Sequence, residues 1–489
     1  MRYLLPIMSG LALVTPAFGQ AIDADGAARL SQDLARYIGA DAIANKIVTV
    51  APDGEAFRIT FDVNGLAGLI PPEAKAKIEV APLSVLAKPL ADGKWDVSGD
   101  AIPAGSFEAD GPEGRYSMQW SIADGKFSGV YDTALAAFLS LAGSQSGMTM
   151  SSKEPRQQMQ ASTGSGGFKL TGAAAATGGV DVIFNHAVAD FMETVQVAPE
   201  PGAPTMPVTL TADNLVMDGS AKGYRTRALL DLLAFGVANP DRAKLQANQA
   251  GLKTRLLAAL PLWNRLDSSY RFDNLKVETP LGAFGSTSMT GGVGMDGVVQ
   301  NGSISYRLAL AGLTMPAGVA PAWSGPLLPT DVDINIGSVG FDLDGAVRKV
   351  IDGLDFGHDP VLPDAVVNGI AADFMMNPPK VVISRSTAKN ADTELALEGE
   401  VTFPAGKPEA NVTVDVAGFD RMIEKLHAAS KSEPKLAQYL PMALVAKGFG
   451  KNLPDGRTQW AVQAKADGSF SVNGVQLRGP EAKTEGGAQ

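Results

Sequence analysis

The feature that most constrains the fold of this chain is an alternation of apolar and polar side chains with a period of two residues. Successive side chains of a β-strand point to opposite faces of its sheet, so this pattern predicts strands with one buried and one solvated face. Such strands are typical of antiparallel sheets. The alternation is clearest in five segments, namely residues 57–63, 116–122, 304–310, 332–336 and 412–416.

The turn signals agree with this interpretation. Asp-Gly and Asn-Gly pairs accept positive φ angles and suit the tight turns of β-hairpins. The Asp-Gly pairs include those that begin at residues 92, 124, 218, 296, 455 and 467, and the Asn-Gly pairs include those at residues 64, 301 and 473. With 54 glycines, 31 prolines and only 19% charged residues, the chain is predicted to adopt a β-rich α+β fold. We expect antiparallel meander sheets with short helices covering them.

Helical spacing of apolar residues is less frequent. Residues 25–38 place Leu30, Leu34 and Tyr37 on one face of a helix. Two further helices are predicted at 226–238 and 240–260. Additional candidates are residues 131–142, 344–352, 362–374, 419–429 and 434–447.

The length of 489 residues exceeds one ordinary hydrophobic core and predicts more than one domain. Residues 197–207 contain four prolines and are interpreted as a stiff boundary. Residues 143–167 carry no period and are interpreted as a connector. The predicted division is a signal peptide at 1–21, a β-rich domain with a leading helix at 22–197, a proline-rich linker at 198–207, an α+β region at 208–480 and a disordered tail at 481–489.

The N-terminus has the pattern of a secretory signal peptide. Arg2 precedes an apolar stretch from Leu4 to Val14, and small residues follow it. The spacing of small residues favours cleavage after Gly19 or Ala21, which predicts export to a bacterial periplasm. Retention of this segment as an anchor remains the alternative. The mature chain is expected to have no transmembrane span.

Charge and cysteine content exclude several function classes. The formal net charge is −11, and the 41 basic residues form no run, which argues against binding nucleic acid and against docking on an anionic membrane by charge. The chain has no cysteine, so thiol catalysis and thiolate metal sites are excluded. A large core allows an exported protein to fold without disulfides.

Residues 292–297 match the spacing of a dinucleotide-binding loop, G-x-G-x-x-G. Such a loop must be followed by a helix whose N-terminus meets the pyrophosphate. Here the next residues lead through Asn301-Gly302 into an alternating segment, so we interpret the glycines as turn residues of a hairpin. The segment 331–337 resembles a calcium loop, but Ile336 occupies the position that requires glycine, and the alternation predicts a strand with Asp331, Asp333 and Asn335 facing water.

Other catalytic signals are missing. No phosphate-binding loop or G-x-S-x-G elbow occurs. The three histidines, His186, His358 and His427, share no short motif, and no H-E-x-x-H is present. We therefore predict no catalytic, cofactor-binding or metal-binding residues and no cofactor. Carboxylates paired in space remain open, because distance along the sequence does not fix distance in the fold.

The C-terminal stretch 439–477 runs through helix, polar link and strands with Asp-Gly and Asn-Gly turns. Its closing ADGSFSVNGVQL, residues 466–477, resembles the ending of YdgA-like and other AsmA-like envelope proteins of Gram-negative bacteria. The wider chain is similar to a family of alphaproteobacterial periplasmic proteins of that style. The resemblance implies a curved, elongated sheet or groove and supplies no catalytic residues. The chain departs from AsmA-like proteins in its expected loss of the N-terminal helix.

Two functions follow as hypotheses. The favoured one is a non-enzymatic exported envelope protein that binds lipid, another apolar ligand or an envelope protein along a β-sheet. The alternative is a hydrolase of envelope glycan or lipid. Strands apolar on both faces would mark a groove, and Leu66–Pro71 and Val381–Ile383 are the examples. The sequence leaves the oligomeric state open.

Overall fold

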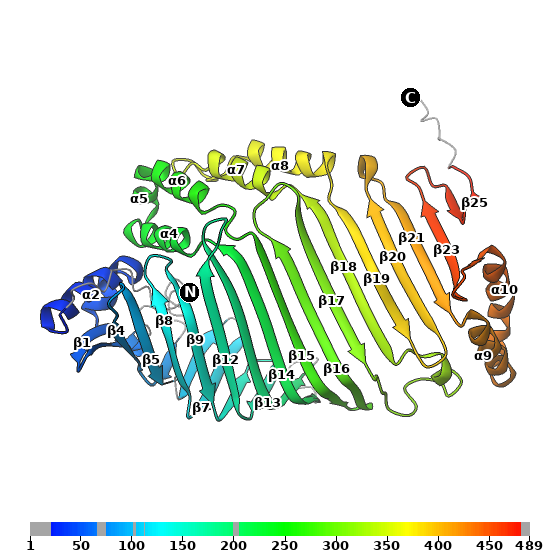
Figure 1. The fold of residues 1–489 in the computed structure, drawn as a ribbon, viewed down its shortest axis with the longest axis horizontal. Helices are drawn as coiled ribbons and strands as arrows, with labels where there is room; N and C mark the ends of the chain where they lie inside the picture. The colour runs from blue at the N-terminus through cyan, green and yellow to red at the C-terminus, as the bar shows by residue number, and fades with distance from the viewer. Residues whose placement is uncertain (1–20, 66–74, 101–103, 112, 199–204, 481–489) are drawn as a thin grey trace. The chain divides into compact units, whose positions relative to one another are not determined.

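The computed structural model describes residues 21–65, 75–100, 104–111, 113–198 and 205–480. The chain divides into two compact units: unit 1 is Met1–Pro280 with Arg348–Pro363, and unit 2 is Leu281–Val347 with Asp364–Gln489. Figure 1 labels their helices and strands. Both are built on antiparallel strands, which confirms the predicted β-rich meander fold with short helices. Residues 1–20 of the predicted signal peptide, the segment Leu66–Pro71 and the predicted tail at 481–489 lie outside the described residues.

Within the described residues, unit 1 contains the longest strands and five helices. The strands are β1 Val48–Asp53, β2 Ala56–Phe61, β3 Lys77–Val80, β4 Leu83–Pro89, β5 Lys94–Asp100, β6 Ala104–Gly111, β7 Gly114–Ala123, β8 Lys126–Asp132, β9 Ala137–Gln145, β10 Gly147–Lys153, β11 Gln157–Thr163, β12 Gly166–Ala174, β13 Val180–Val197, β14 Met206–Tyr224 and β15 Arg265–Thr279. The helices are α2 Ala24–Ile38, α3 Ala40–Ala44, α4 Thr226–Ala238, α5 Arg242–Ala247 and α6 Gln249–Ala259.

Strand β13 joins two branches of the unit 1 sheet. Its first half pairs with β12 and its second half with β11, while β14 pairs along its other edge. One branch runs β1, β2, β4, β5, β8, β9 and β12, and the other runs β3, β6, β7, β10 and β11. The length of β13 allows both branches to share one strand.

Helix α2 covers the core of unit 1. Asp23 begins it by accepting a hydrogen bond from the Gly26 backbone N–H at 2.7 Å, which satisfies one of the free donors of the first turn. Leu30 and Leu34 recur at helical spacing and pack into the buried cluster that contains Phe57 and Trp95. The predicted leading helix at 25–38 is therefore confirmed.

Unit 2 is a meander in which each long strand pairs with the next. Its strands are β16 Gly282–Asp296, β17 Gly302–Ala311, β18 Asp331–Phe341, β19 Lys380–Lys389, β20 Glu394–Thr402, β21 Glu409–Ala417, β22 Lys451–Asn452, β23 Thr458–Ala464, β24 Phe470–Val472 and β25 Val475–Arg478. Its helices are α8 Asp364–Met376, α9 Phe419–Ser432 and α10 Tyr439–Phe449, with the short 3-10 helices η3 Gly325–Leu327, η4 Pro404–Gly406 and η5 Pro434–Gln438. Helix α7, Leu343–Gly353, contains residues of both units.

Two local predictions are wrong. Residues 131–142, expected to be helical, form the end of β8, a turn and the start of β9. Residues 143–167, interpreted as a connector, lie largely in β9, β10 and β11. The proline-rich segment 198–207 joins β13 to β14, which pair from Val197 and Met206 onwards within unit 1.

Of the six Asp-Gly pairs named above as turn signals, one lies within a strand. Asp218-Gly219 lies inside β14, where Asp218 pairs in register with Asn185 and Ser269. The Asn185 side-chain amide donates to the Asp218 carboxylate at 2.7 Å. Pairing on both edges of β14 therefore overrides the local preference of this dipeptide for a turn.

Candidate functional site

One face of the unit 2 sheet carries a continuous apolar surface, which we call the apolar face. The strand register places apolar side chains opposite one another across neighbouring strands, as in the row formed by Val293, Tyr306, Ile336 and Ile383. The face extends through the remaining strands of the meander. Its members are Met289, Val293, Met295, Ile304, Tyr306, Leu308, Leu310, Val332, Ile334, Ile336, Val381, Ile383, Leu395, Leu397, Val412, Val414, Val416, Trp460, Val462 and Val472.

Gly399 allows two strands of this face to lie close together. It continues the row of Ile383 and pairs with Val412 on β21. Its φ is +156°, and a Cβ there would lie 2.2 Å from the Asn411 carbonyl oxygen. A side chain at this position would therefore push β20 and β21 apart.

Part of the apolar face is exposed to solvent. Five of its side chains retain between 39% and 49% of their surface, namely Val293, Tyr306, Ile334, Ile336 and Leu395. Contiguous exposed apolar patches on proteins mark sites that bind other molecules. The sequence prediction was right that 331–336 is a strand, but Ile334 and Ile336 are exposed, while Asp331, Asp333 and Asn335 are half-buried.

The opposite face of the same sheet is polar and carries its own ion pairs. Arg307 donates to both carboxylate oxygens of Asp333, at 3.1 and 2.8 Å, and this contact lowers the pKa of Asp333. Arg385 similarly pairs with Asp415 at 3.2 Å. The two faces differ sharply in polarity, so an apolar ligand would be accepted by only one of them.

Helices α9 and α10 cover the apolar face at the C-terminal strands. Phe419 of α9 packs edge-on against Trp460 of β23, with ring centroids 5.0 Å apart and planes at 69°. Trp460, Val416 and Val472 form a small buried core with Phe419, and Ala446 and Phe449 of α10 pack against it. The helices thus shelter one end of a surface that is open further along the sheet.

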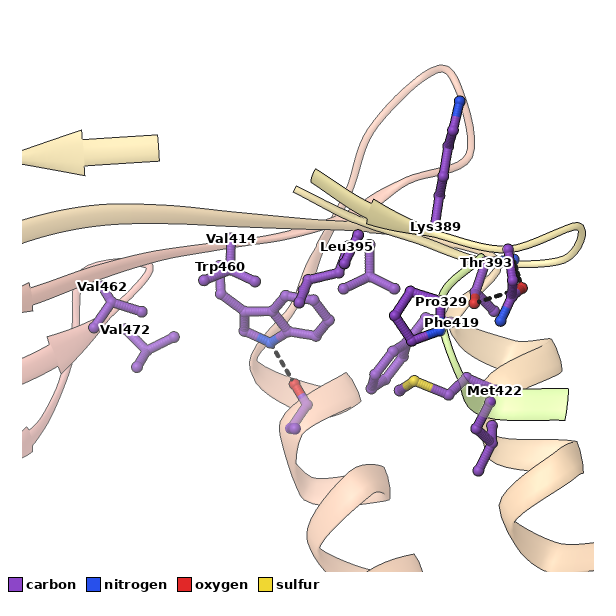
Figure 2. Close-up of a pocket in the computed structure, with 15 residues that line it drawn as sticks. Pro329, Lys389, Thr393, Leu395, Val414, Phe419, Met422, Trp460, Val462 and Val472 are labelled. Carbon is purple, nitrogen blue, oxygen red and sulfur yellow. Dashed lines mark hydrogen bonds between the residues drawn. The ribbon is translucent and has the colours of Figure 1, made fainter. Parts of the chain in front are cut away.

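A pocket of about 520 Å³ lies between these helices and the sheet (Figure 2). Its walls are almost entirely apolar. The lining residues come from β19–β21, β23 and β24, from the turn between β19 and β20, from α9 and α10, and from η3 and the loop after it. They are Leu327, Pro329, Ala388, Lys389, Asn390, Thr393, Leu395, Val414, Val416, Phe419, Met422, Ala446, Trp460, Val462 and Val472.

The polar atoms in this pocket already have partners. The Trp460 indole N–H donates to the Ala446 carbonyl at 2.7 Å, as Figure 2 shows. At the other end, the Thr393 hydroxyl donates to the Asn390 side-chain oxygen at 3.1 Å, and Asn390 donates to the Leu328 carbonyl. The Lys389 side chain extends away from the pocket. A ligand would therefore be held by contact with apolar side chains.

The pocket has a size typical of small-molecule sites, which range over roughly 300–1,000 Å³. Leu395 connects it to the exposed part of the apolar face, since this residue both lines the pocket and remains 46% exposed. The site is thus a sheltered pocket continuous with an open apolar surface. Sequence reasoning identified β21, α9 and α10 among the elements that form it but not β20, and it named none of the residues as a site.

Unit 1 has a similar apolar row that contains a histidine. Phe168, His186, Met217 and Tyr270 lie opposite one another on β12 to β15, and the Phe184 ring lies 6.4 Å from the imidazole. Burial among these neighbours lowers the pKa of His186, because charging the ring there is unfavourable.

This predicts an acid-sensitive element in unit 1. Below about pH 6.5 an unfolded histidine gains a proton, while the folded His186 resists it, so the free energy of unfolding should fall as the pH decreases through that value. His186→Phe should remove this part of the pH dependence. Urea unfolding of the unmodified protein and of the His186→Phe variant, followed by far-UV circular dichroism at several pH values, measures the free energy of unfolding of each as a function of pH. Equal pH dependence in the two chains would contradict the prediction.

The residues considered in the sequence do not converge. His358 lies in a loop, where its Nδ1 is 2.7 Å from Asp355, and His427 lies on α9. Among the described residues, no three His, Asp or Glu side chains are grouped so as to hold a metal ion. Val381 and Ile383 belong to the apolar face, whereas Val382 lies opposite Glu400 on the other.

The glycine motif at 292–297 forms the end of β16 and the turn into β17, as predicted. The Asp296 carboxylate accepts hydrogen bonds from the backbone N–H and the hydroxyl of Ser303, at 2.8 and 2.6 Å. These bonds tie the two strands together at the turn. The glycines therefore serve a hairpin, and no helix begins there.

Within the part of the chain that the structure describes, no helix combines the length and apolar character needed to cross a bilayer.

Comparison with known proteins yields no relative. No family model matches the chain. No curated protein and no solved structure matches it either, so the site described above is the basis for any functional conclusion.

Proposed function

We propose that this chain is an exported envelope protein that binds the acyl chain of a lipid on the apolar face of unit 2. The observation that carries the proposal is the pocket beside Trp460 and its continuity with exposed apolar side chains at Leu395. The proposed periplasmic location rests on the signal-peptide pattern of residues 1–21, and the resemblance to AsmA-like proteins rests on residues 466–477.

The geometry favours a small apolar molecule over a protein partner. Protein interfaces are broad and carry about one hydrogen bond per 100–200 Å². This pocket is concave, and the hydrogen-bonding groups of Trp460, Asn390 and Thr393 are satisfied within the protein. Burying an apolar chain against such walls gains free energy in proportion to the area removed from water.

The hydrolase alternative finds less support at this site. The lining residues include no histidine, serine or carboxylate, and the one charged side chain, Lys389, extends away from the pocket. General acid–base or nucleophilic catalysis needs such groups within hydrogen-bond reach of the substrate. Acyl-chain binding requires none of them.

The proposal predicts that Leu395→Glu weakens acyl-chain binding by roughly tenfold or more, because a carboxylate in the pocket wall must lose water when the chain binds. Leu395 is half exposed, so the substitution should leave the fold intact. The measurement is titration of the full-length protein with a fatty acid brominated along its chain, which quenches nearby tryptophan fluorescence. The quenched signal is assigned to Trp460 with a Trp460→Phe variant.

Gln463→Glu is the matched control. Gln463 is exposed on β23 and lies on the polar face, opposite in register to Asn411. Gln463→Glu adds the same charge as Leu395→Glu without altering the pocket. The affinity of this variant for the fatty acid should equal that of the unmodified chain. Unchanged affinity in the Leu395→Glu chain, or equal loss in both variants, would refute binding at this pocket.

A further inference from the structure

Helix α10 carries a second apolar surface, separate from the pocket. From Leu440 to Ala446 every side chain of the helix is apolar. Ala446 and Phe449 face inward and pack against the core around Trp460. The rest of the helix exposes Tyr439, Met442, Leu444 and Val445, which retain 49% to 66% of their surface.

This exposed surface is not needed to hold the helix in place. Surface helices of folded proteins ordinarily combine one apolar and one polar face, and a helix that is apolar all round belongs in a core or in a lipid environment. The inward side of α10 already supplies the packing. The apolar residues that remain exposed therefore lower solubility without stabilising the fold, which points to a binding partner.

The surrounding charge indicates which partner fits. Residues 419–452, which contain α9, η5 and α10, hold six basic and three acidic side chains, a formal net charge of +3 in a chain whose total is −11. Lys435 lies in η5 just before α10, and Lys451 lies two residues after the end of α10. Both are exposed. Lysines that flank an apolar helix surface suit the anionic headgroups at a membrane interface.

We propose that α10 docks unit 2 onto an anionic lipid surface. Met442, Leu444 and Val445 enter the boundary between headgroups and acyl chains, and Tyr439 lies at headgroup level, where tyrosine is enriched. Lys435 and Lys451 contact the lipid phosphates. The negative net charge of the whole chain argues against docking on an anionic membrane by charge alone. In this proposal the main attraction is the insertion of apolar side chains of α10 into the membrane.

The proposal goes beyond acyl-chain binding and does not depend on it. None of the residues that enter the membrane lines the pocket, so the two activities can be separated by substitution. Helix α10 nevertheless links them, because Ala446 on its inward side lines the pocket. A lipid leaving the membrane at this helix would meet the pocket directly behind it.

The test is sedimentation of the full-length protein with vesicles of phosphatidylcholine containing a quarter phosphatidylglycerol. A triple variant, Met442→Gln, Leu444→Gln and Val445→Gln, keeps good helix-forming residues and should weaken vesicle binding by roughly tenfold or more. Lys435→Gln and Lys451→Gln should each weaken it about fivefold, as expected for one lysine near an anionic surface.

The control is a triple glutamine variant of helix α8, Val367→Gln, Met375→Gln and Met376→Gln. These three side chains are 48% to 75% exposed. If this control chain loses binding as much as the α10 variant, exposed apolar residues act without specificity and the proposal fails. Vesicle binding by the α10 variant equal to that of the unmodified chain also overturns it. Binding that survives Leu395→Glu but not the α10 changes supports docking as an activity separate from acyl-chain binding.

Discussion

Replacing Trp95 with alanine is expected to lower the free energy of unfolding of the α2-covered part of unit 1 by about 3–5 kcal/mol, the usual loss for a large buried aromatic side chain. Trp95 on β5 is fully buried, and its ring lies 6.3 Å from that of Phe57 on β2. Removing the indole leaves a cavity between these strands and α2. Hydrogen–deuterium exchange of peptides from β2, β4 and β5, read by mass spectrometry, measures the loss locally.

The same substitution at Trp120 provides the comparison. Trp120 lies on β7 in the other branch of the unit 1 sheet and is only half-buried. Because the Trp120 side chain buries less apolar surface than that of Trp95, Trp120→Ala should lower the free energy of unfolding clearly less than Trp95→Ala. Equal losses at both positions would mean that the α2-covered cluster is not the main core of unit 1.

The strands with regular alternation could be predicted because their pattern is strong and local. Residues 116–122 fall within β7 and residues 412–416 within β21. Several glycine turns followed from local chemistry as well, since Asp467-Gly468 and Asn473-Gly474 separate β23, β24 and β25. Where a strand alternates and a turn residue follows, little else is needed to specify a meander.

One of the missed segments depends on the chemistry of a local turn, and the other depends on pairing with strands distant in sequence. Residues 131–142 contain good helix formers, but the Asp132 carboxylate accepts from the backbone N–H of Ala134 and Leu135, and Ala136 has a φ of +54°. These features make a turn between β8 and β9. In β10, Met148 and Met150 alternate with Thr149 and Ser151, a weak signal that becomes a strand only through pairing with β7 and β11.

The candidate site was beyond sequence reasoning for a different reason. Alternation in β18 is the same whether Ile334 and Ile336 meet a second layer or remain open to solvent. Which part of the apolar face α9 and α10 cover depends on how those helices fold back after β21. The pocket exists only because Phe419 and Ala446 reach Trp460 from two separate helices.

Replacing Trp460 with alanine is expected to destabilise the contact of α9 and α10 with the sheet by about 3–5 kcal/mol. The ring packs against Phe419, and its N–H is the donor to the Ala446 carbonyl. Losing both leaves a cavity and a carbonyl without this donor. Peptides from α10 and β23 should exchange hydrogen faster, and acyl-chain binding should fall because the pocket loses a wall.

Trp460→Phe separates packing from hydrogen bonding. Phenylalanine keeps an aromatic ring near Phe419 but cannot donate to Ala446, so its loss should be about 1–2 kcal/mol, the cost of one unmatched hydrogen-bonding group. If both variants lose the same amount, the hydrogen bond dominates and the ring does not hold the helices. If Trp460→Phe is near the unmodified chain while Trp460→Ala loosens α10, the indole ring joins the two helices to the sheet, and the sheltered end of the apolar face depends on it.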